Sequence, residues 1–332
     1  MKALVHHEFG RASAVLRLEE VETPTPSEGE VLVRVMATSA NPYDWHFIRG
    51  EPWFIRLGPG GLRAPKHPIP GGDFAGVVEA VGSGATGGFS EGDEVYGFQH
   101  GAFAEYVAVP HGRMARKPAE LSWEQAASLP LAAVTAWQGL KGMGGIEAGQ
   151  KVLIIGASGG IGSLAVQMAK AWGAEVTGVC STANVPTVRS VGADHVIDYV
   201  SEDYLRGDDR YDLAFQLGGT TSPLAIRRVL SDRGTLVQCA GDGSKLLGPI
   251  LNVVMGMVAS RFMSQRVVVV NTVEDTASLD AVREMVEAGQ LVPVIDHTTE
   301  FEDAGFAVDE VETGSPQGKI AISGYGREVP QE

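Results

Sequence analysis

Residues 151–173 read KVLIIGASGGIGSLAVQMAKAWG, and this stretch constrains the fold more than any other. An apolar run ends at Gly156, a glycine-rich turn follows, and helical spacing of apolar residues begins near Ile161. A strand, a tight turn and a helix in this order place backbone N–H groups at a helix N-terminus, where a pyrophosphate is stabilised. A purely structural glycine turn is the alternative, but the repeated strand and helix units that follow favour a dinucleotide site.

Within this turn, Ala157, Gly159 and Gly162 occupy the three positions of the G-x-G-x-x-G fingerprint. Alanine is acceptable at the first position if it keeps a negative φ, because only a positive φ strongly penalises a Cβ atom. Glycine at the second position lets the backbone approach the phosphates, and glycine at the third lets the helix pack on the strand. The predicted cofactor-binding residues of the loop are Ala157, Ser158, Gly159, Gly160, Ile161 and Gly162.

The choice of dinucleotide depends on the end of the second strand, AEVTGVC, which an acidic residue follows in many NAD-binding proteins. Here the strand ends in Cys180, Ser181 and Thr182, without a carboxylate to repel a 2′-phosphate. NADPH is therefore favoured over NADH, with Ser181, Thr182 and Asn184 as hydrogen-bond donors. No lysine or arginine stands immediately beside them, and Arg189 is interpreted as a solvated helix charge.

The length of 332 residues suits two domains of about 150 residues each. Residues 1–122 contain short alternating strands with Gly, Pro and Asp turns, which predicts a β-rich, barrel-like domain. Strands and helices alternate over residues 123–272, which predicts a doubly wound α/β domain with a parallel sheet. Residues 273–332 are expected to return to the first domain. The long loop 41–61 between two strands is a candidate place for function.

Composition excludes several classes of partner and site. The formal net charge of −15 would repel phosphate backbones and anionic membranes, so neither nucleic acid nor a membrane is an expected partner. Two cysteines, Cys180 and Cys239, are too few for a disulfide framework, which indicates a reducing compartment. No signal-peptide pattern opens the chain, so a cytoplasmic location is expected. The apolar stretch 246–263 is interpreted as a buried or interface helix, because Asn252 and Arg261 interrupt it.

Several separated motifs carry a family resemblance that covers nearly the whole chain. They are NPYD at 41–44, GGDFAGVVEAVG at 71–82, GDEVYGF at 92–98, GAFAEYVAVP at 101–110 and AVTAWQGL at 133–140, followed by A-x-G-x-x-G. Their order resembles the medium-chain dehydrogenase/reductase superfamily, in its zinc-free, quinone-oxidoreductase-like branch. The stretch CSTANVPTVRSVGADHVIDY resembles its reticulon-interacting, NAD(P)-dependent alcohol dehydrogenase-like subgroup. The resemblance implies a GroES-like β-rich catalytic domain beside a Rossmann domain.

Zinc-dependent members of this superfamily hold a catalytic metal at three positions. Here the resemblance places Asn41, Gly72 and Leu131 there, and none of these side chains ligates zinc properly. Without a Lewis acid to polarise an alcohol oxygen, hydride donation from NADPH to an electron-poor small molecule is the expected chemistry. Asp73 is interpreted as a buried carboxylate that holds its loop by hydrogen bonds, and His67 as a surface residue.

The resemblance also implies roles for residues of the first domain and the first helix after it. Asn41 would lie near the nicotinamide, and Thr135 by its ring or ribose. His46 stands where relatives often carry a tyrosine, so it would donate a proton, hydrogen-bond a carbonyl oxygen, or simply be a satisfied pocket histidine. Tyr43 and Trp53 would form a stacking wall for a flat acceptor, or serve only in packing. A tyrosine acid that alkene-reducing relatives carry near position 53 is absent.

The remaining predicted cofactor contacts follow from strand ends and from the resemblance. They are Tyr199 near the adenosine phosphate, Gly218, Gly219, Ala240 and Gly241 at strand ends, and Gly318 with Lys319 in a closing loop. Lys319 has a second interpretation as a solvated charge. Residues 241–264 would cover the cleft or pack between subunits. The strand QRVVVVNT at 265–272 would be a sheet edge that invites a homodimer.

Three functions remain open from the sequence. The leading one is a zinc-independent, NADPH-dependent oxidoreductase that passes hydride to a quinone or an activated carbonyl or enone. The second is an NADPH-dependent alkene reductase acting on enones. The third is an NADP(H)-binding sensor or scaffold with vestigial catalysis, because no unambiguous acid stands among the catalytic candidates.

Overall fold

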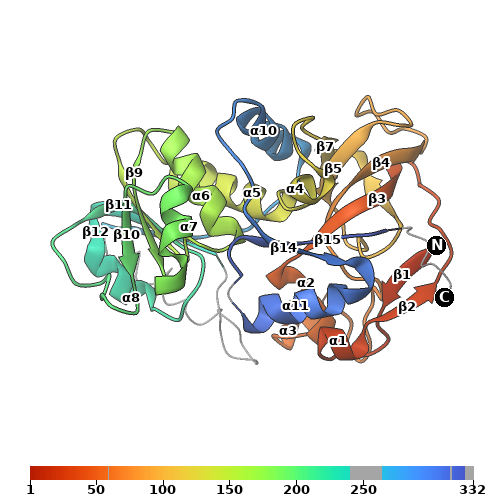
Figure 1. Ribbon diagram of the computed structural model, residues 1–332, viewed down its shortest axis with the longest axis horizontal. Helices are drawn as coiled ribbons and strands as arrows, with labels where there is room; N and C mark the ends of the chain where they lie inside the picture. The colour runs from red at the N-terminus through yellow and green to blue at the C-terminus, as the bar shows by residue number, and fades with distance from the viewer. Residues whose placement is uncertain (59, 240–263, 315, 326–332) are drawn as a thin grey trace. The chain divides into compact units, whose positions relative to one another are not determined.

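The computed structural model describes residues 1–58, 60–239, 264–314 and 316–325, and the chain divides into two units (Figure 1). The β-rich unit comprises Met1–Leu131, Glu274–Glu287 and Ile295–Glu332, and the parallel-sheet unit comprises Ala132–Val273 and Ala288–Val294. The predicted α/β class with two such domains is confirmed. The predicted boundaries differ in detail, because residues 123–131 stay with the β-rich unit and residues 288–294 join the other.

The β-rich unit is built on a mostly antiparallel sheet with strand order β14-β15-β3-β4-β5-β7, and β6 pairs with β3. β3 is the longest of these strands, and most of its residues are buried because partners flank it on both edges. A separate two-stranded sheet joins β1 to β2. The strands are β1 (Lys2–Val5), β2 (Arg17–Glu20), β3 (Glu30–Ala40), β4 (Asp73–Val81), β5 (Glu94–Phe98), β6 (Tyr106–Pro110), β7 (Met114–Arg116), β14 (Ile295–Glu300) and β15 (Lys319–Ser323).

Helices from both ends of the chain complete this unit. Figure 1 shows α11 beside α1 and α2, and their apolar residues share one core with β15. Asp309 on α11 ties the two ends together, because its buried carboxylate accepts hydrogen bonds from the backbone N–H groups of Ala12 and Ser13. The helices are α1 (Ala12–Val15), α2 (Pro42–Arg49), α3 (Phe54–Leu57), α4 (Trp123–Ala127), α10 (Thr276–Glu287) and α11 (Ala304–Thr313).

The parallel-sheet unit has the strand order β10-β9-β8-β11-β12-β13, with every neighbouring pair parallel. This is the doubly wound order in which ligands bind at the carboxyl ends of the strands, where the order reverses beside β8. The strands are β8 (Lys151–Ile155), β9 (Glu175–Cys180), β10 (His195–Asp198), β11 (Tyr211–Gln216), β12 (Leu230–Gln238) and β13 (Arg266–Val269). The helices are α5 (Pro130–Trp137), which starts two residues before the unit's boundary, α6 (Gly160–Ala171), α7 (Val185–Ser190) and α8 (Pro223–Ile226).

Helical backbone begins after Ser122 and is then interrupted. Ser122 caps α4, because its hydroxyl accepts from the Gln125 N–H while the Gln125 side chain accepts from the Ser122 N–H. The helix stops before Pro130, whose ring excludes helical backbone at the residue before it. A new helix, α5, starts at this proline and continues as a π-helical turn over Gln138–Gly144.

The apolar stretch 246–263 lies outside the described residues, as does most of the predicted covering segment 241–264. Within the part of the chain that is described, no helix is both long and apolar enough to cross a membrane. The location of the protein stays a prediction.

Candidate functional site

The glycine turn has the geometry that a phosphate loop requires. β8 ends at Ile155, and Gly156 then takes a φ of +89°, a conformation that favours glycine. None of the described residues other than glycine has a positive φ, so Ala157 meets the condition set for alanine at this position. A Cβ on Gly162 would lie 2.1 Å from the carbonyl oxygen of Gly156, which confirms that this glycine allows the helix to pack on the strand.

Gly159 differs from Gly162 in what surrounds it. It is the N-cap of α6, with φ −77° and ψ 177°, a backbone conformation open to any residue. A Cβ added there would meet nothing nearer than the Gly156 carbonyl oxygen at 3.7 Å. Gly160, Ile161 and Gly162 form the first turn of α6. The N–H groups of a first helical turn have no hydrogen-bond acceptor within the helix. This end of α6 therefore offers free donors and a positive dipole end to an anion.

Two of the predicted cofactor residues bind each other. The side-chain amide of Asn184 donates to the Ser158 hydroxyl over 2.9 Å, and both residues are buried. This hydrogen bond holds the glycine turn to the segment that follows β9. Ser181 is half-buried, and Thr182 is exposed beside it.

A carboxylate that sequence reasoning missed lies at the end of the neighbouring strand. β10 pairs in parallel with β9, which puts Asp198 opposite Cys180. The Thr182 hydroxyl donates to Asp198 Oδ2 over 2.7 Å, and this hydrogen bond lowers the pKa of Asp198. The premise that no carboxylate stands here is therefore wrong, because it considered only the end of β9. Tyr199 follows directly and is 56% exposed.

The other predicted contacts of the parallel-sheet unit are placed as follows. Gly218 and Gly219 follow the end of β11, and Gly219 has a φ of +78°. The Thr135 hydroxyl shares a hydrogen bond of 2.9 Å with that of Thr272, a partner distant in sequence. Ala240 and Gly241 lie outside the described residues. The roles of all these residues toward a cofactor stay predictions.

In the β-rich unit, Asp73 is the centre of a buried polar network. Its Oδ2 accepts from the Ser39 hydroxyl at 2.8 Å and from the Asn41 side-chain amide at 2.9 Å. Its Oδ1 accepts from the backbone N–H of Leu131 at 2.8 Å. Asp73 has no exposed surface, so its interpretation as a buried carboxylate that holds the chain by hydrogen bonds is confirmed.

Lys319 supplies the positive charge of this network. Its ammonium donates to the Ala40 carbonyl at 3.1 Å, to Asn41 Oδ1, and to Asp73 Oδ2 at 3.3 Å. The residue is 5% exposed, so its interpretation as a solvated charge is wrong. Three protein oxygens already surround the ammonium, and a contact with the cofactor stays a prediction for Lys319 and for Gly318, whose φ is +89°.

Asp44 is the second carboxylate of this region, and it is also fully buried. Its Oδ2 accepts from the Asn41 backbone N–H at 2.8 Å, while its Oδ1 has no partner among the described residues. Burial raises the pKa of Asp44 to about 8, and the charge of Asp73 adds to the rise, while hydrogen bonds from Asn41 and the charge of Lys319 oppose it. Asp44 is therefore mostly protonated at neutral pH.

The raised pKa predicts a loss of stability at alkaline pH. The folded protein binds the Asp44 proton more tightly than the unfolded chain, whose carboxyl titrates near 4, so stability falls as the pH rises toward 8. Between pH 6 and 9 this group alone should remove about 2–3 kcal/mol from the free energy of unfolding. Asp44→Asn should abolish that loss, as measured by urea denaturation across this pH range. Parallel pH profiles for the two proteins would contradict the assignment.

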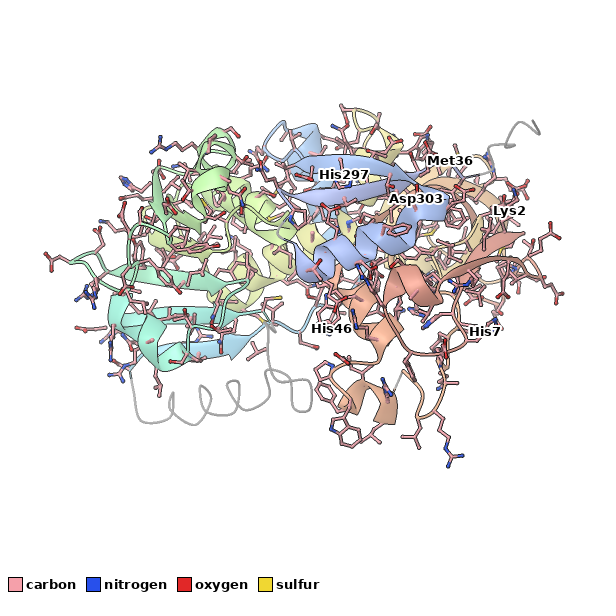
Figure 2. All side chains as sticks on the ribbon, turned by 60° about the horizontal axis from the view of Figure 1, so that its bottom comes forward. Lys2, His7, Met36, His46, His297 and Asp303 are labelled. Carbon is pink, nitrogen blue, oxygen red and sulfur yellow. The ribbon has the colours of Figure 1, made fainter. Side chains whose placement is uncertain are left out.

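The segment after Asn41 carries the residues predicted to contact the electron acceptor, among them His46 and Trp53. His46 Nδ1 donates to the Glu51 carbonyl at 2.7 Å, and its ring stacks on Trp45 with centroids 3.6 Å apart. Figure 2 shows His46 apart from the other labelled histidines. With Nδ1 so engaged, proton transfer by His46 would have to use Nε2, and this role stays a prediction. Trp53 is 43% exposed at the start of α3.

Tyr43 belongs to a group of rings that we call the aromatic cluster. Its ring centroid lies 4.4 Å from that of Phe47, 5.2 Å from Phe98 and 6.2 Å from His100, and His67 lies 5.3 Å from His100. The cluster consists of Tyr43, Phe47, His67, Phe98 and His100. Trp53 makes no ring contact with it among the described residues, so the two predicted wall residues are not brought together. Sequence reasoning missed His100, which stands alone between β5 and the next glycine.

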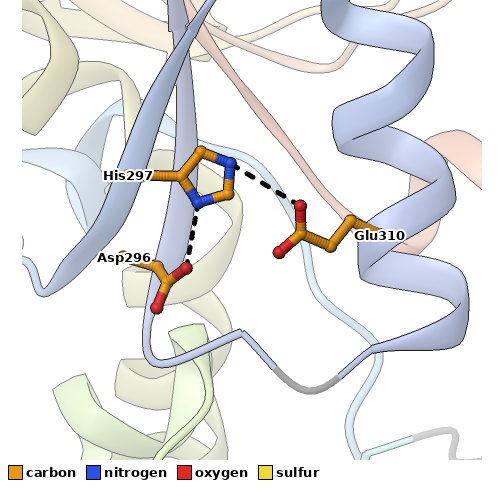
Figure 3. Close-up of side chains that lie close together, drawn as sticks. All are labelled: Asp296, His297 and Glu310. Atoms are coloured by element: carbon orange, nitrogen blue, oxygen red, sulfur yellow. Dashed lines mark hydrogen bonds and ion pairs between the residues drawn. The ribbon is translucent and has the colours of Figure 1, made fainter.

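A group of possible metal ligands lies elsewhere in the β-rich unit, on β14 and α11 (Figure 3). His297 Nδ1 lies 2.9 Å from Asp296 Oδ2, and His297 Nε2 lies 3.6 Å from Glu310 Oε2. The two carboxylates thus face opposite nitrogens of one ring. One possible ligand atom from each residue lies within 4.8 Å of the others, but exposed acidic groups commonly gather without an ion, so we assign this group no metal.

Comparison with known proteins places this geometry in a family. The alcohol dehydrogenase GroES-like domain family matches residues 27–119, and the zinc-binding dehydrogenase family matches residues 191–322. The 2-methylene-furan-3-one reductase of Solanum lycopersicum is 34% identical over 340 residues, covering 97% of this chain and 79% of that protein. The chain belongs to the medium-chain dehydrogenase/reductase superfamily.

Two further comparisons support membership of this superfamily. The mitochondrial NAD(P)H oxidoreductase RTN4IP1 of Bos taurus is 32% identical, with 89% of this chain and 81% of that protein covered. The structure of the quinone oxidoreductase from Coxiella burnetii superposes with a TM-score of 0.85 at 27% identity, covering 98% of this chain and 99% of that one. Both are oxidoreductases, as the resemblance to this superfamily implied for the present chain.

The zinc that one of the matched families is named for does not fit the residues of this member. Asn41 and Leu131 both bind Asp73, and Gly72 precedes it, so the three positions assigned to the ligands do converge. A Cβ on Gly72 would lie 2.2 Å from the Phe98 ring, which leaves no room for a histidine there. The Asp73 carboxylate already accepts from Ser39, Asn41, Leu131 and Lys319. Beside it the site offers an amide and an ammonium in place of the nitrogen and sulfur ligands that zinc prefers.

Proposed function

We propose that the protein is a zinc-independent oxidoreductase that passes hydride from NADPH to a quinone or to an activated enone or carbonyl compound. The observation that carries this proposal is the network around Asp73. An ammonium group, Lys319, donates to Asn41, which is one of the three residues at which the superfamily resemblance expects a zinc ligand, and its charge is neutralised by Asp73 at 3.3 Å. A centre of this kind cannot polarise an alcohol oxygen as a bound cation does, so an acceptor that is already electron-poor suits it.

The residues that would hold NADPH belong to the parallel-sheet unit. The N–H groups of the first turn of α6 face the position of a pyrophosphate, and Gly159 leaves space for it. Bound NADPH supplies a hydride from C4 of its nicotinamide. In the β-rich unit, Asn41 is a positioning residue, because its amide is held by Lys319 on one side and by Asp73 on the other. This rigidity would fix the backbone at the start of α2, which carries Tyr43.

The names of relatives support the acceptor class. The Solanum lycopersicum relative is named for reducing 2-methylene-furan-3-one, in which an alkene is conjugated to a ketone. A quinone likewise carries carbonyl groups conjugated to alkenes. Reduction of the alkene of an enone is therefore retained as the second candidate within the same class of acceptor.

The proposal is tested with steady-state turnover. Purified protein should oxidise NADPH in the presence of p-benzoquinone or methyl vinyl ketone, and dialysis against EDTA should leave the rate unchanged. Loss of turnover on EDTA treatment, with recovery on zinc addition, would disprove zinc independence. Saturable NADPH binding without turnover across quinones, enones and aldehydes would instead support the sensor hypothesis.

Asp198 predicts a measurable effect on the choice of cofactor. A carboxylate beside Thr182 would repel a 2′-phosphate and accept from a ribose 2′-hydroxyl. Asp198→Asn should therefore raise the ratio of kcat/KM for NADPH to that for NADH by roughly 10-fold, about 1.4 kcal/mol of relieved repulsion. Asp208→Asn, a charge removal at an exposed site of the same unit, should leave the ratio unchanged. An unaltered ratio in both variants would remove Asp198 from the cofactor site.

We also propose a homodimer through the edge of the parallel sheet. β13 is the terminal strand of that sheet among the described residues, and the QRVVVVNT stretch includes it. An unpaired strand edge of β-branched residues favours pairing with a second copy. Light scattering at micromolar concentration should give the mass of a dimer, and a monomeric mass would refute the proposal.

A further inference from the structure

His100 has two buried polar atoms without partners. Neither Nδ1 nor Nε2 is accessible, and neither forms a hydrogen bond with the residues that the structure describes. A buried donor or acceptor left unpaired costs about 1–3 kcal/mol, so native structures rarely contain one without a reason. An imidazole must carry at least one N–H, and no acceptor among the described residues meets hydrogen-bond geometry with it. A phenylalanine at this position would avoid the cost.

The surroundings of His100 suit a flat, conjugated molecule. The Phe47 ring lies 5.7 Å away and the Tyr43 ring 6.2 Å away, so two aromatic rings border the imidazole. Both are half-buried, and His67 on the other side is exposed, which shows that the aromatic cluster reaches the protein surface. Tyr43 follows Asn41 by two residues on α2, so the cluster adjoins the Asp73 network.

The lowered pKa of His100 indicates that its imidazole is a neutral hydrogen-bond donor rather than a cation. Burial lowers the pKa of His100 to about 4, and the neighbouring charges of His67 and His6 lower it further. The backbone carbonyl of His67 offsets part of this fall without reaching hydrogen-bond geometry. At neutral pH the ring is therefore uncharged, with one N–H and one bare nitrogen. A neutral imidazole still carries one N–H, so it can donate a hydrogen bond to a carbonyl oxygen at neutral pH.

We propose that His100 binds the carbonyl oxygen of the acceptor, a conjugated ketone or quinone stacked against Tyr43 and Phe47. This inference rests on the proposed function. When hydride adds to the alkene carbon remote from the carbonyl group, its electron pair forms the new C–H bond. The π electrons of the alkene then shift toward the carbonyl carbon and those of the carbonyl group collect on its oxygen, where the His100 N–H stabilises the charge. A proton from water then completes the reduced product. Both nitrogens are covered in the free protein, so the rings that border the imidazole have to shift to admit the acceptor.

Removal of the donor tests the assignment. His100→Phe should lower kcat/KM for methyl vinyl ketone by roughly 100-fold, as expected for one lost donor to a developing oxyanion. His100→Gln, which keeps a side-chain N–H, should recover most of this loss. The NADPH dissociation constant should not change, and the melting temperature of His100→Phe should rise because two unpaired polar atoms disappear. His7→Phe, at an exposed histidine of the same unit, serves as the control.

The outcomes separate this inference from the proposed function. If the unmodified protein turns over and His100→Phe retains its kcat/KM, the inference is overturned while the function stands. If the unmodified protein does not turn over, the function fails, and the imidazole resonances of His100 decide the inference. Their nuclear magnetic resonance shifts should change on addition of acetophenone, a flat ketone without a reducible alkene, and unchanged resonances would overturn the inference.

Discussion

Replacement of Lys319 by methionine is expected to lower the free energy of unfolding by about 3–5 kcal/mol, because it leaves a buried carboxylate without its counter-charge. Asp73 has no exposed surface, and Lys319 is its partner at 3.3 Å. The same change removes the hydrogen bond to Asn41 Oδ1. Methionine keeps much of the volume of the lysine stem, so the loss reports on the charge rather than on a cavity.

The controls for this variant are a surface lysine and a double variant. Lys66→Met removes an exposed charge of the same unit and should change stability by less than about 0.5 kcal/mol. Lys319→Met combined with Asp73→Asn should be more stable than Lys319→Met alone, since no charge is then left buried. Urea denaturation at neutral pH measures all three. A loss for Lys319→Met no larger than that for Lys66→Met would contradict the buried pair.

Sequence periodicity was enough to predict the parallel sheet. Each strand and helix of residues 151–238 carries its own local pattern, and the rule that crossovers are right-handed leaves few arrangements of such units. The glycine turn was equally predictable, because the contact that requires glycine at position 162 is made with Gly156, six positions earlier in the chain. At this turn, residues that contact each other in space are also close in the sequence.

The polar network around Asp73 joins residues that are far apart in the sequence, so sequence patterns could not predict it. Lys319 lies 246 positions from Asp73 in the chain, and only the pairing of β15 with β3 and of β3 with β4 brings the two together. In the same way, Asp198 reaches Thr182 through the register of two parallel strands. A search of the sequence confined to the end of β9 could not find it, whereas alignment of the two predicted strands in parallel would have.

His100 was missed for a different reason. A single histidine between a strand and a glycine has no pattern, and its importance lies in the hydrogen bonds that it does not make. Absence of a partner is a property of the packed structure. Three rings from two segments, Tyr43 and Phe47 on α2 and His67, border this imidazole, and each of them is indistinguishable from ordinary packing in the sequence.

Gly159→Asp is expected to weaken NADPH binding by at least roughly 100-fold while leaving the fold intact. The backbone of Gly159 is extended and a Cβ has space, so the substitution strains nothing. Aspartate is a slightly better N-cap than glycine, and it should stabilise α6 by about a few tenths of a kcal/mol. The same carboxylate would stand where the pyrophosphate binds, and two like charges about 4 Å apart repel by about 4 kcal/mol at a dielectric constant near 20.

The matched control for this variant is Gly159→Asn, which adds a side chain of the same shape without the charge. It should bind NADPH more tightly than Gly159→Asp, and the difference should shrink as salt screens the repulsion. Fluorescence titration with NADPH gives both dissociation constants, and thermal unfolding shows that both variants are folded. Equal losses in the two variants would mean that bulk rather than charge blocks the site. Unchanged affinity in Gly159→Asp would mean that the pyrophosphate does not bind at the N-terminus of α6, and the dinucleotide assignment would then fail at its first step.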